Sequence, residues 1–191
     1  MAIQAEILLI NAEYFKKYTH TNDSVDPNLL NPSIYLAQDK YLQGTLGTKL
    51  LQYLKDDIAS LPSDYQTLLD NYVRRALCWW TMVEVLPHLS YKLDNGTLVQ
   101  RISEDASPVD DARMKDLMDK AQSNARFYTS RLDDYLCANS SLFPEYQEYE
   151  NGDIAPRPQR SGESTILFSN GNTASSRERS GAQWLNRHLP R

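Results

Sequence analysis

The chain has 191 residues, of which 41% are hydrophobic, enough to build the core of one domain of ordinary size with an appendage. Its 25 acidic residues outnumber its 20 basic residues, and the net charge is −5. This balance gives no general attraction to nucleic acid or anionic lipid, and it argues against a sequence-reading DNA-binding protein. We find no signal peptide and no stretch of the roughly 18 apolar residues that cross a bilayer, so we expect a soluble protein.

Three helices are predicted in the first sixty residues. The first is short, from residue 12 to 18, with Asn11 as its cap because its side-chain oxygen can accept from an unpaired backbone N–H. The second begins near Asp26-Pro27 or near Pro32 and ends at the Gly44 and Gly47 pair. The third runs from about 48 to 60, and Pro62 prevents it from continuing.

A long central helix is predicted after this point. Ser63 is its expected cap, and apolar residues recur from Leu68 to Leu86 at steps of three and four. A turn signal at Asn95-Gly96 precedes alternating apolar character over residues 97–102, which predicts a strand or one arm of a hairpin.

A last helix is opened by Ser107-Pro108 and reaches about Asn139. The predicted fold class is therefore mainly α. It is a small antiparallel bundle of four to five helices with a short β hairpin or strand near 97–102 and an extended C-terminal arm.

The composition changes near Phe143-Pro144, because lysine is absent beyond it while Gly, Ser, Asn and Arg become frequent. We predict a helical domain over residues 1–144 and an arm over 145–191 that a partner orders. One apolar island of the arm indicates a docking strand, and a second could form about two helical turns. A solvated linker is the alternative. The expected partner-binding residues are Ile166, Leu167, Phe168, Trp184, Leu185, Arg187 and Leu189.

Catalytic and metal-binding interpretations have little support. His20, His88 and His188 lie far apart in a loop, a helix end and the arm, and Gly44 to Gly47 lacks the Lys-Ser/Thr of a phosphate loop. Paired carboxylates such as Asp110-Asp111 point about 100° apart on a helix. We therefore predict no catalytic residue, no cofactor and no metal.

Interfaces have more support than catalysis. The chain has twelve tyrosines and four phenylalanines, a bias that favours surfaces exposed to water only part of the time, such as interfaces. The alternative, which is equally well supported, is that the tyrosines only cover a small core. Trp79 lies one step off the apolar stripe of its helix and is expected to meet a neighbouring subunit. The full set of possible subunit-interface residues is Trp79, Leu98, Val99 and Ile102.

Several stretches resemble the head-to-tail connector family of tailed bacteriophages, also called adaptor or ring proteins, particularly the version in crAss-like phages. The resemblance covers roughly residues 8–149. It rests on Leu9-Ile10-Asn-Ala-Glu-Tyr-Phe-Lys-Lys-Tyr18, Ala37-Gln38, Leu46-Gly47-Thr48 with Leu50-Leu51, Asn95-Gly96, Ala125-Arg-Phe-Tyr-Thr-Ser-Arg-Leu-Asp-Asp-Tyr-Leu136, and Phe143-Pro-Glu-Tyr146.

The resemblance implies a virion protein of the phage neck, made in the host bacterial cytoplasm, and not an enzyme. It implies a homo-oligomeric ring, with twelve copies, that contacts the portal protein and the next ring or tail protein. DNA would pass through the ring without sequence-specific binding, and no membrane is involved. The alternatives are a regulatory or adaptor module that is not a structural part of the virion and binds a host protein through its arm, and an enzyme with an unfamiliar divalent-ion site.

Overall fold

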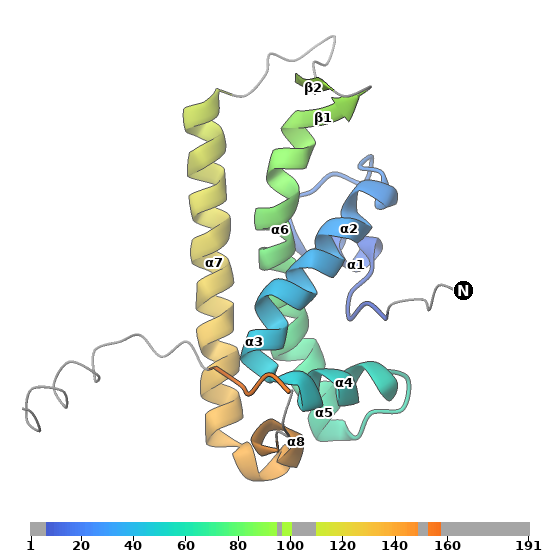
Figure 1. Ribbon diagram of the computed structural model, residues 1–191, viewed down its shortest axis with the longest axis vertical. Coiled ribbons are helices and arrows are strands. Elements are labelled where there is room, and N and C mark those ends of the chain that lie inside the picture. The colour runs from blue at the N-terminus through green and yellow to red at the C-terminus, as the bar shows by residue number, and fades with distance from the viewer. Residues whose placement is uncertain (1–6, 95–96, 101–109, 149–152, 158–191) are drawn as a thin grey trace, which may run out of the picture. The chain divides into compact units, whose positions relative to one another are not determined.

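The computed structural model describes residues 7–94, 97–100, 110–148 and 153–157. These residues are mostly helical, which confirms the prediction of a mainly α protein (Figure 1). By its internal contacts the chain divides into two compact units, and residues 1–159, the first unit, contain all of the described residues. Within the described ranges, no helix is both long enough and apolar enough to cross a membrane.

The first half of this unit is a series of short helices. They are α1 (Ala12–Tyr18), α2 (Pro27–Ala37), the π-helical turn η1 (Gln38–Leu42), α3 (Gln43–Leu46) and α4 (Thr48–Asp56). The second half is α5 (Ser63–Leu68), the π-helical turn η2 (Leu69–Val73), α6 (Arg74–Ser90), β1 (Tyr91–Asp94), β2 (Thr97–Gln100), α7 (Asp111–Ala138), the 3₁₀ turn η3 (Ser140–Leu142) and α8 (Pro144–Gln147).

Local capping fixes several of these boundaries. The Asn11 side chain accepts from the backbone N–H of Tyr14 at 2.7 Å, so the predicted cap of α1 is confirmed. Asp26 caps α2, with a proline at the first helical position, and this selects the earlier of the two predicted starts. The predicted cap at Ser63 is wrong. Pro62 occupies the cap position in an extended conformation, and Ser63 is already helical.

The end of α4 differs from the prediction. Helix α4 ends at Asp56 instead of residue 60, because the chain turns there and the N–H of Ser60 donates to the carbonyl of Asp57 at 2.8 Å. The described part of the last helix begins at Asp111 and ends at Ala138. The opening signal at Ser107-Pro108 lies outside the described residues.

Helices α6 and α7 run side by side in opposite directions, and β1 continues from the end of α6 (Figure 1). Strands β1 and β2 pair antiparallel, with Leu93 opposite Leu98 and Lys92 opposite Val99. Helix α2 packs on α6 and crosses in front of it in the view of Figure 1. The short helices α4, α5 and α8 gather at the opposite end of α6 from the strands.

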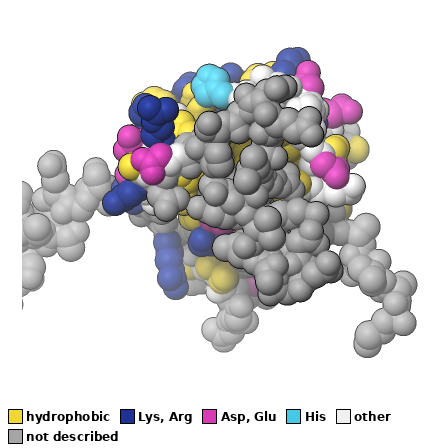
Figure 2. Space-filling model, turned by 90° about the horizontal axis from the view of Figure 1, so that it is seen from above, with side chains coloured by type: hydrophobic (Ala, Val, Ile, Leu, Met, Phe, Trp, Pro, Cys, Tyr) yellow, Lys and Arg dark blue, Asp and Glu magenta, His cyan; other side chains and the backbone are white. Residues whose placement is uncertain are grey.

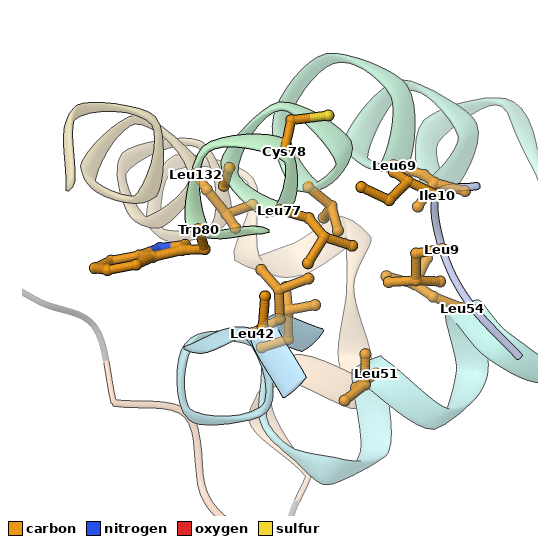
Figure 3. Packing of buried hydrophobic residues seen from close by; sticks show 14 of the residues in the cluster. Leu9, Ile10, Leu42, Leu51, Leu54, Leu69, Leu77, Cys78, Trp80 and Leu132 are labelled. Carbon is orange, nitrogen blue, oxygen red and sulfur yellow. The ribbon is translucent and has the colours of Figure 1, made fainter. Parts of the chain in front are cut away.

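The core lies between these helices, and nearly every helix contributes to it. Leu42, Leu77 and Leu132, from η1, α6 and α7, are completely buried. Leu9 and Ile10, which precede α1, are buried as well and lie beside Leu54 and Leu69 (Figure 3). The N-terminal segment before α1 is therefore part of the core.

A buried glutamine holds this N-terminal segment in place. Gln38 is fully buried, and its side-chain oxygen accepts from the N–H of Leu9 at 3.0 Å while its side-chain nitrogen donates to the carbonyl of Ile7 at 3.2 Å. The carbonyl of Leu9 accepts from Arg74 Nε at 2.9 Å. Both polar groups of the Leu9 backbone are thus satisfied by side chains, as burial requires. Gln38 begins η1 and Arg74 follows η2, so both π-helical turns lie beside this segment.

A second network of polar and aromatic side chains links α6 to η1 and α7. Tyr41 stacks on Trp80 with ring centroids 3.8 Å apart, and Trp80 Nε1 donates to the Thr129 hydroxyl in α7 at 2.9 Å. On the other edge, the Tyr41 hydroxyl and Lys40 Nζ both donate to Glu84 Oε1, at 2.6 and 2.8 Å. These contacts join η1, α6 and α7 in one continuous network.

Glu84 is expected to make stability depend on pH in the acid range. Burial raises the pKa of Glu84, but the hydrogen bonds from Lys40 and Tyr41 outweigh burial, and the pKa is lowered from its ordinary value of 4.5. A lowered folded-state pKa gives stability that is present above the unfolded value and is lost as pH falls through the folded value. Glu84→Gln should lower the free energy of unfolding by about 0.2–1 kcal/mol at neutral pH. The stability of this variant should also decrease less as the pH falls into the acid range.

Urea unfolding of both proteins between neutral and acid pH measures this effect. The difference between the two free energies of unfolding should shrink as the pH falls. If the difference at acid pH, below the ordinary pKa of a glutamate, were the same as at neutral pH, the Glu84 charge would contribute nothing to stability.

Candidate partner-binding site

A break between two helices creates the most distinctive polar site of the described residues. Gly47 has φ 78° and ψ 162°, a conformation that is essentially restricted to glycine, and it separates α3 from α4. In an uninterrupted helix the N–H of Thr48 would donate to the carbonyl of Gly44. The break separates these two groups, and both need other partners.

The missing partners come from residues 153–157, a segment that we call the strap. The N–H of Thr48 donates to the carbonyl of Ile154 at 3.0 Å, and the N–H of Arg157 donates to the carbonyl of Gly44 at 2.7 Å. The N–H of Ile154 donates to the Thr48 hydroxyl at 3.0 Å. Lys49 and Asp153 add an ion pair at 4.0 Å. The helix break thus binds an extended peptide mainly through its main chain.

Gly47 also makes room for the strap. A Cβ atom at this position would lie 2.8 Å from both Cδ and Cγ of Pro156 and 3.2 Å from the carbonyl oxygen of Ile154. Such a contact with Pro156 is closer than real Cβ atoms allow. The glycine is therefore required twice, by its own backbone angles and by the approach of the strap.

An aromatic cluster fixes the chain just before the strap. Phe143 is completely buried, and its ring meets Tyr65 edge-on at 5.1 Å between centroids. The Tyr65 hydroxyl donates to Glu145 at 2.5 Å, and burial together with this hydrogen bond raises the pKa of Tyr65. Tyr53 lies 4.7 Å from Tyr65, and Tyr135 lies 6.1 Å from Phe143.

These contacts place the beginning of the predicted arm on the helical domain. The composition indicated a boundary between residues 144 and 145, whereas the first compact unit continues to residue 159. The difference has a physical reason. Glu145 is bound through a tyrosine hydroxyl and the strap through its main chain, and neither interaction requires the apolar side chains that a change in composition detects.

The residues predicted for interfaces have different outcomes. Trp79 is partly buried against the core, with the exposed His20 ring edge-on at 6.2 Å. Leu98 and Val99 lie in β2, and only their backbone is described. Ile102 and the arm residues Ile166, Leu167, Phe168, Trp184, Leu185, Arg187 and Leu189 lie outside the described residues.

The titratable side chains of the described ranges form no metal site, and the buried Cys78 thiol is not reactive. No group of three or more His, Cys, Asp or Glu side chains in these ranges could hold a metal ion. Burial raises the pKa of the Cys78 thiol to about 12, which keeps it protonated and unreactive at neutral pH. On the end viewed from above, acidic and basic side chains lie near each other around the margin (Figure 2).

Sequence reasoning missed the strap and its docking site. The sequence predicts that a helix ends at the Gly44 and Gly47 pair, but nothing in the neighbourhood of Gly47 points to a segment more than a hundred positions away. The available signal was the short run Ile154-Ala155-Pro156, which begins with the first aliphatic residue after α8. Such a run is too brief to predict docking.

Comparison with known proteins gives the family. A model described as "Family of unknown function (DUF6712)" matches residues 9–156, from the buried Leu9 to Pro156 of the strap. The match covers more than half of the chain, and the protein belongs to this family. No curated protein and no solved structure matches the chain.

Proposed function

We propose that this protein is a structural component of the neck of a tailed bacteriophage. In this proposal it forms a ring of copies, twelve by resemblance, below the portal protein, joins the head to the tail and continues the DNA channel. Each subunit is a small antiparallel bundle of four to five helices with the β1–β2 hairpin at one end. The protein is made in the host bacterial cytoplasm and takes its place in the virion.

The observation that carries the proposal is the strap. Its main-chain hydrogen bonds to Gly44 and Thr48 hold Arg157 at a defined place on the helical domain. The residues that follow it include two apolar islands in a polar background, which have little of their own chain to pack on. A segment tethered at a fixed point and able to order on a partner suits an assembly protein.

The charge of the chain also supports the proposal. The net charge is −5, and the six arginines of the arm are balanced by six acidic residues, so the helical domain carries the excess. A negative channel wall repels phosphate groups and avoids the strong binding that rows of Lys and Arg produce. DNA could then move through the ring in either direction.

The first test is the light-scattering mass of the full chain, alone and mixed with the portal protein encoded near it. We expect a defined complex with the mass of a portal plus a ring. A protein that does not respond to the portal would contradict the connector function and would favour the alternative, an adaptor that binds a host protein through its arm.

The second test concerns the first apolar island of the arm. Changing Ile166, Leu167 and Phe168 together to Ser in the full chain should abolish portal or neighbour binding while leaving the helical domain folded. A matched control changes Thr173, Ser175 and Ser176 to Ala in the polar part of the arm. Equal binding by both variants would remove the arm from the proposed interface.

A further inference from the structure

The outer face of α7 carries a stripe of charged residues around one exposed phenylalanine. Phe127 is 63% exposed, an unusual position for a large aromatic side chain. With about 100° of rotation per residue, the members of the stripe fall within an arc of about 60°. All of them are exposed: Arg113, Asp116, Lys120, Phe127, Arg131 and Asp134.

The other side of α7 packs on the helical domain, and within the stripe Arg131 lies over the Tyr72 ring of η2 while Phe127 meets the ring of Tyr128 edge-on. Ala125, Leu132 and Leu136 are completely buried, and they lie on the side that packs against α6 and η2. Figure 1 shows α6 along one side of α7, with the opposite side at the edge of the helical domain. The stripe from residue 113 to 134 covers about 32 Å of this helix.

The stripe is complementary to itself when reversed. If a second α7 runs antiparallel with the two-fold axis between Ser123 and Asn124, Arg113 of each copy lies opposite Asp134 of the other. Asp116 then lies opposite Arg131 in the same way. Lys120 lies opposite Phe127, where an ammonium group can meet the face of an aromatic ring. Two-fold symmetry produces each of these contacts twice.

Other antiparallel registers are less favourable. Moving one helix by a single turn places Arg113 opposite Arg131, which brings like charges together. Moving it by a heptad places Phe127 opposite itself and Lys120 opposite Asp134, but it leaves Arg113 and Asp116 without opposite charges. The register centred between residues 123 and 124 places each arginine of the stripe opposite an aspartate and Lys120 opposite Phe127.

We propose that two copies of this chain associate through their α7 helices in this antiparallel register. The stripe on α7 thus binds the same stripe on a second copy of the chain, and the two are matched by their complementary charges. This pairing does not depend on the proposed ring, since it is an isologous contact and a ring needs a heterologous one.

The test uses charge exchange in the full chain, followed by sedimentation equilibrium over a range of protein concentrations. The wild-type protein should form a dimer of 21.9 kDa subunits, and its dissociation constant should increase as salt is added. Arg113→Asp and Asp134→Arg should each raise the dissociation constant by at least about tenfold, because each places like charges together twice. The double exchange should restore dimerisation.

Two further variants separate pairing from a general effect of charge or folding. Lys115→Asp makes the same type of change on an exposed residue about 200° around α7 from Arg113, and it should leave the dimer intact. Phe127→Ser should weaken the dimer while the far-ultraviolet circular dichroism stays the same. A monomer at all concentrations would overturn the pairing, as would a double exchange that fails to restore the dimer.

Discussion

Replacing Gly47 by alanine is expected to destabilise the helical domain and to release the strap. The backbone angles of Gly47 alone should cost an alanine about 1–3 kcal/mol. The added methyl group would also lie 2.8 Å from Pro156, so the strap must move away. This movement would break the hydrogen bonds that Gly44 and Thr48 make with the strap.

Gly44→Ala is the matched control for this substitution. A Cβ at Gly44 meets nothing within 4 Å, and the residue lies inside α3, so alanine there should be neutral or stabilise by up to about 1 kcal/mol. Urea unfolding measures both variants. Hydrogen exchange at the Thr48 and Arg157 amides should become faster in Gly47→Ala alone. If both variants behaved alike, the strap would not depend on the glycine.

Replacing Gln38 by leucine is expected to have a comparable effect from the other end of the chain. Leucine has a similar volume, but its side chain cannot accept a hydrogen bond from the N–H of Leu9. Leu9 is only 1% exposed, so water cannot replace the lost acceptor. An unsatisfied buried N–H costs about 1–3 kcal/mol. The N-terminal segment should therefore detach from the core, and hydrogen exchange at the Leu9 amide should become faster.

A Gln38→Glu variant separates the hydrogen bond from side-chain volume. A protonated glutamic acid can accept from Leu9 and donate to Ile7 much as Gln38 does, whereas a buried carboxylate faces the carbonyl of Ile7. Burial should raise the pKa of this glutamate. The variant should then be closest to the unchanged protein at low pH and lose stability relative to it as pH rises. A pH-independent difference would contradict this role of Gln38.

Much of the fold could be predicted because the relevant signals are local. Asn11 and Asp26 cap helices within three residues of their own positions, and the apolar steps of α6 reflect burial on one face. The same reasoning failed at Ser63, because proline and serine are both compatible with the start of a helix and only the backbone angles of Pro62 decide between them.

The candidate site could not be predicted in the same way. The hydrogen bond from the Thr48 N–H to the Ile154 carbonyl joins residues 106 positions apart, and it is made by main-chain atoms that every sequence possesses. The role of Gln38 is equally hidden, since a glutamine beside a helical apolar stripe is normally solvated. Its burial follows from the π-helical turn that begins there and from Leu9, 29 positions earlier.

The way in which the strap is bound determines which sequence changes the strap should tolerate. Its hydrogen bonds involve the main chain of Ile154 and Arg157, so most side chains between them can change without loss of binding. Their spacing cannot change, because one inserted residue would shift the Arg157 amide by about 3.3 Å and turn it to the other side of the segment. Insertions and deletions should therefore be rare within residues 153–157, while fusions placed after Arg157 should leave the helical domain undisturbed.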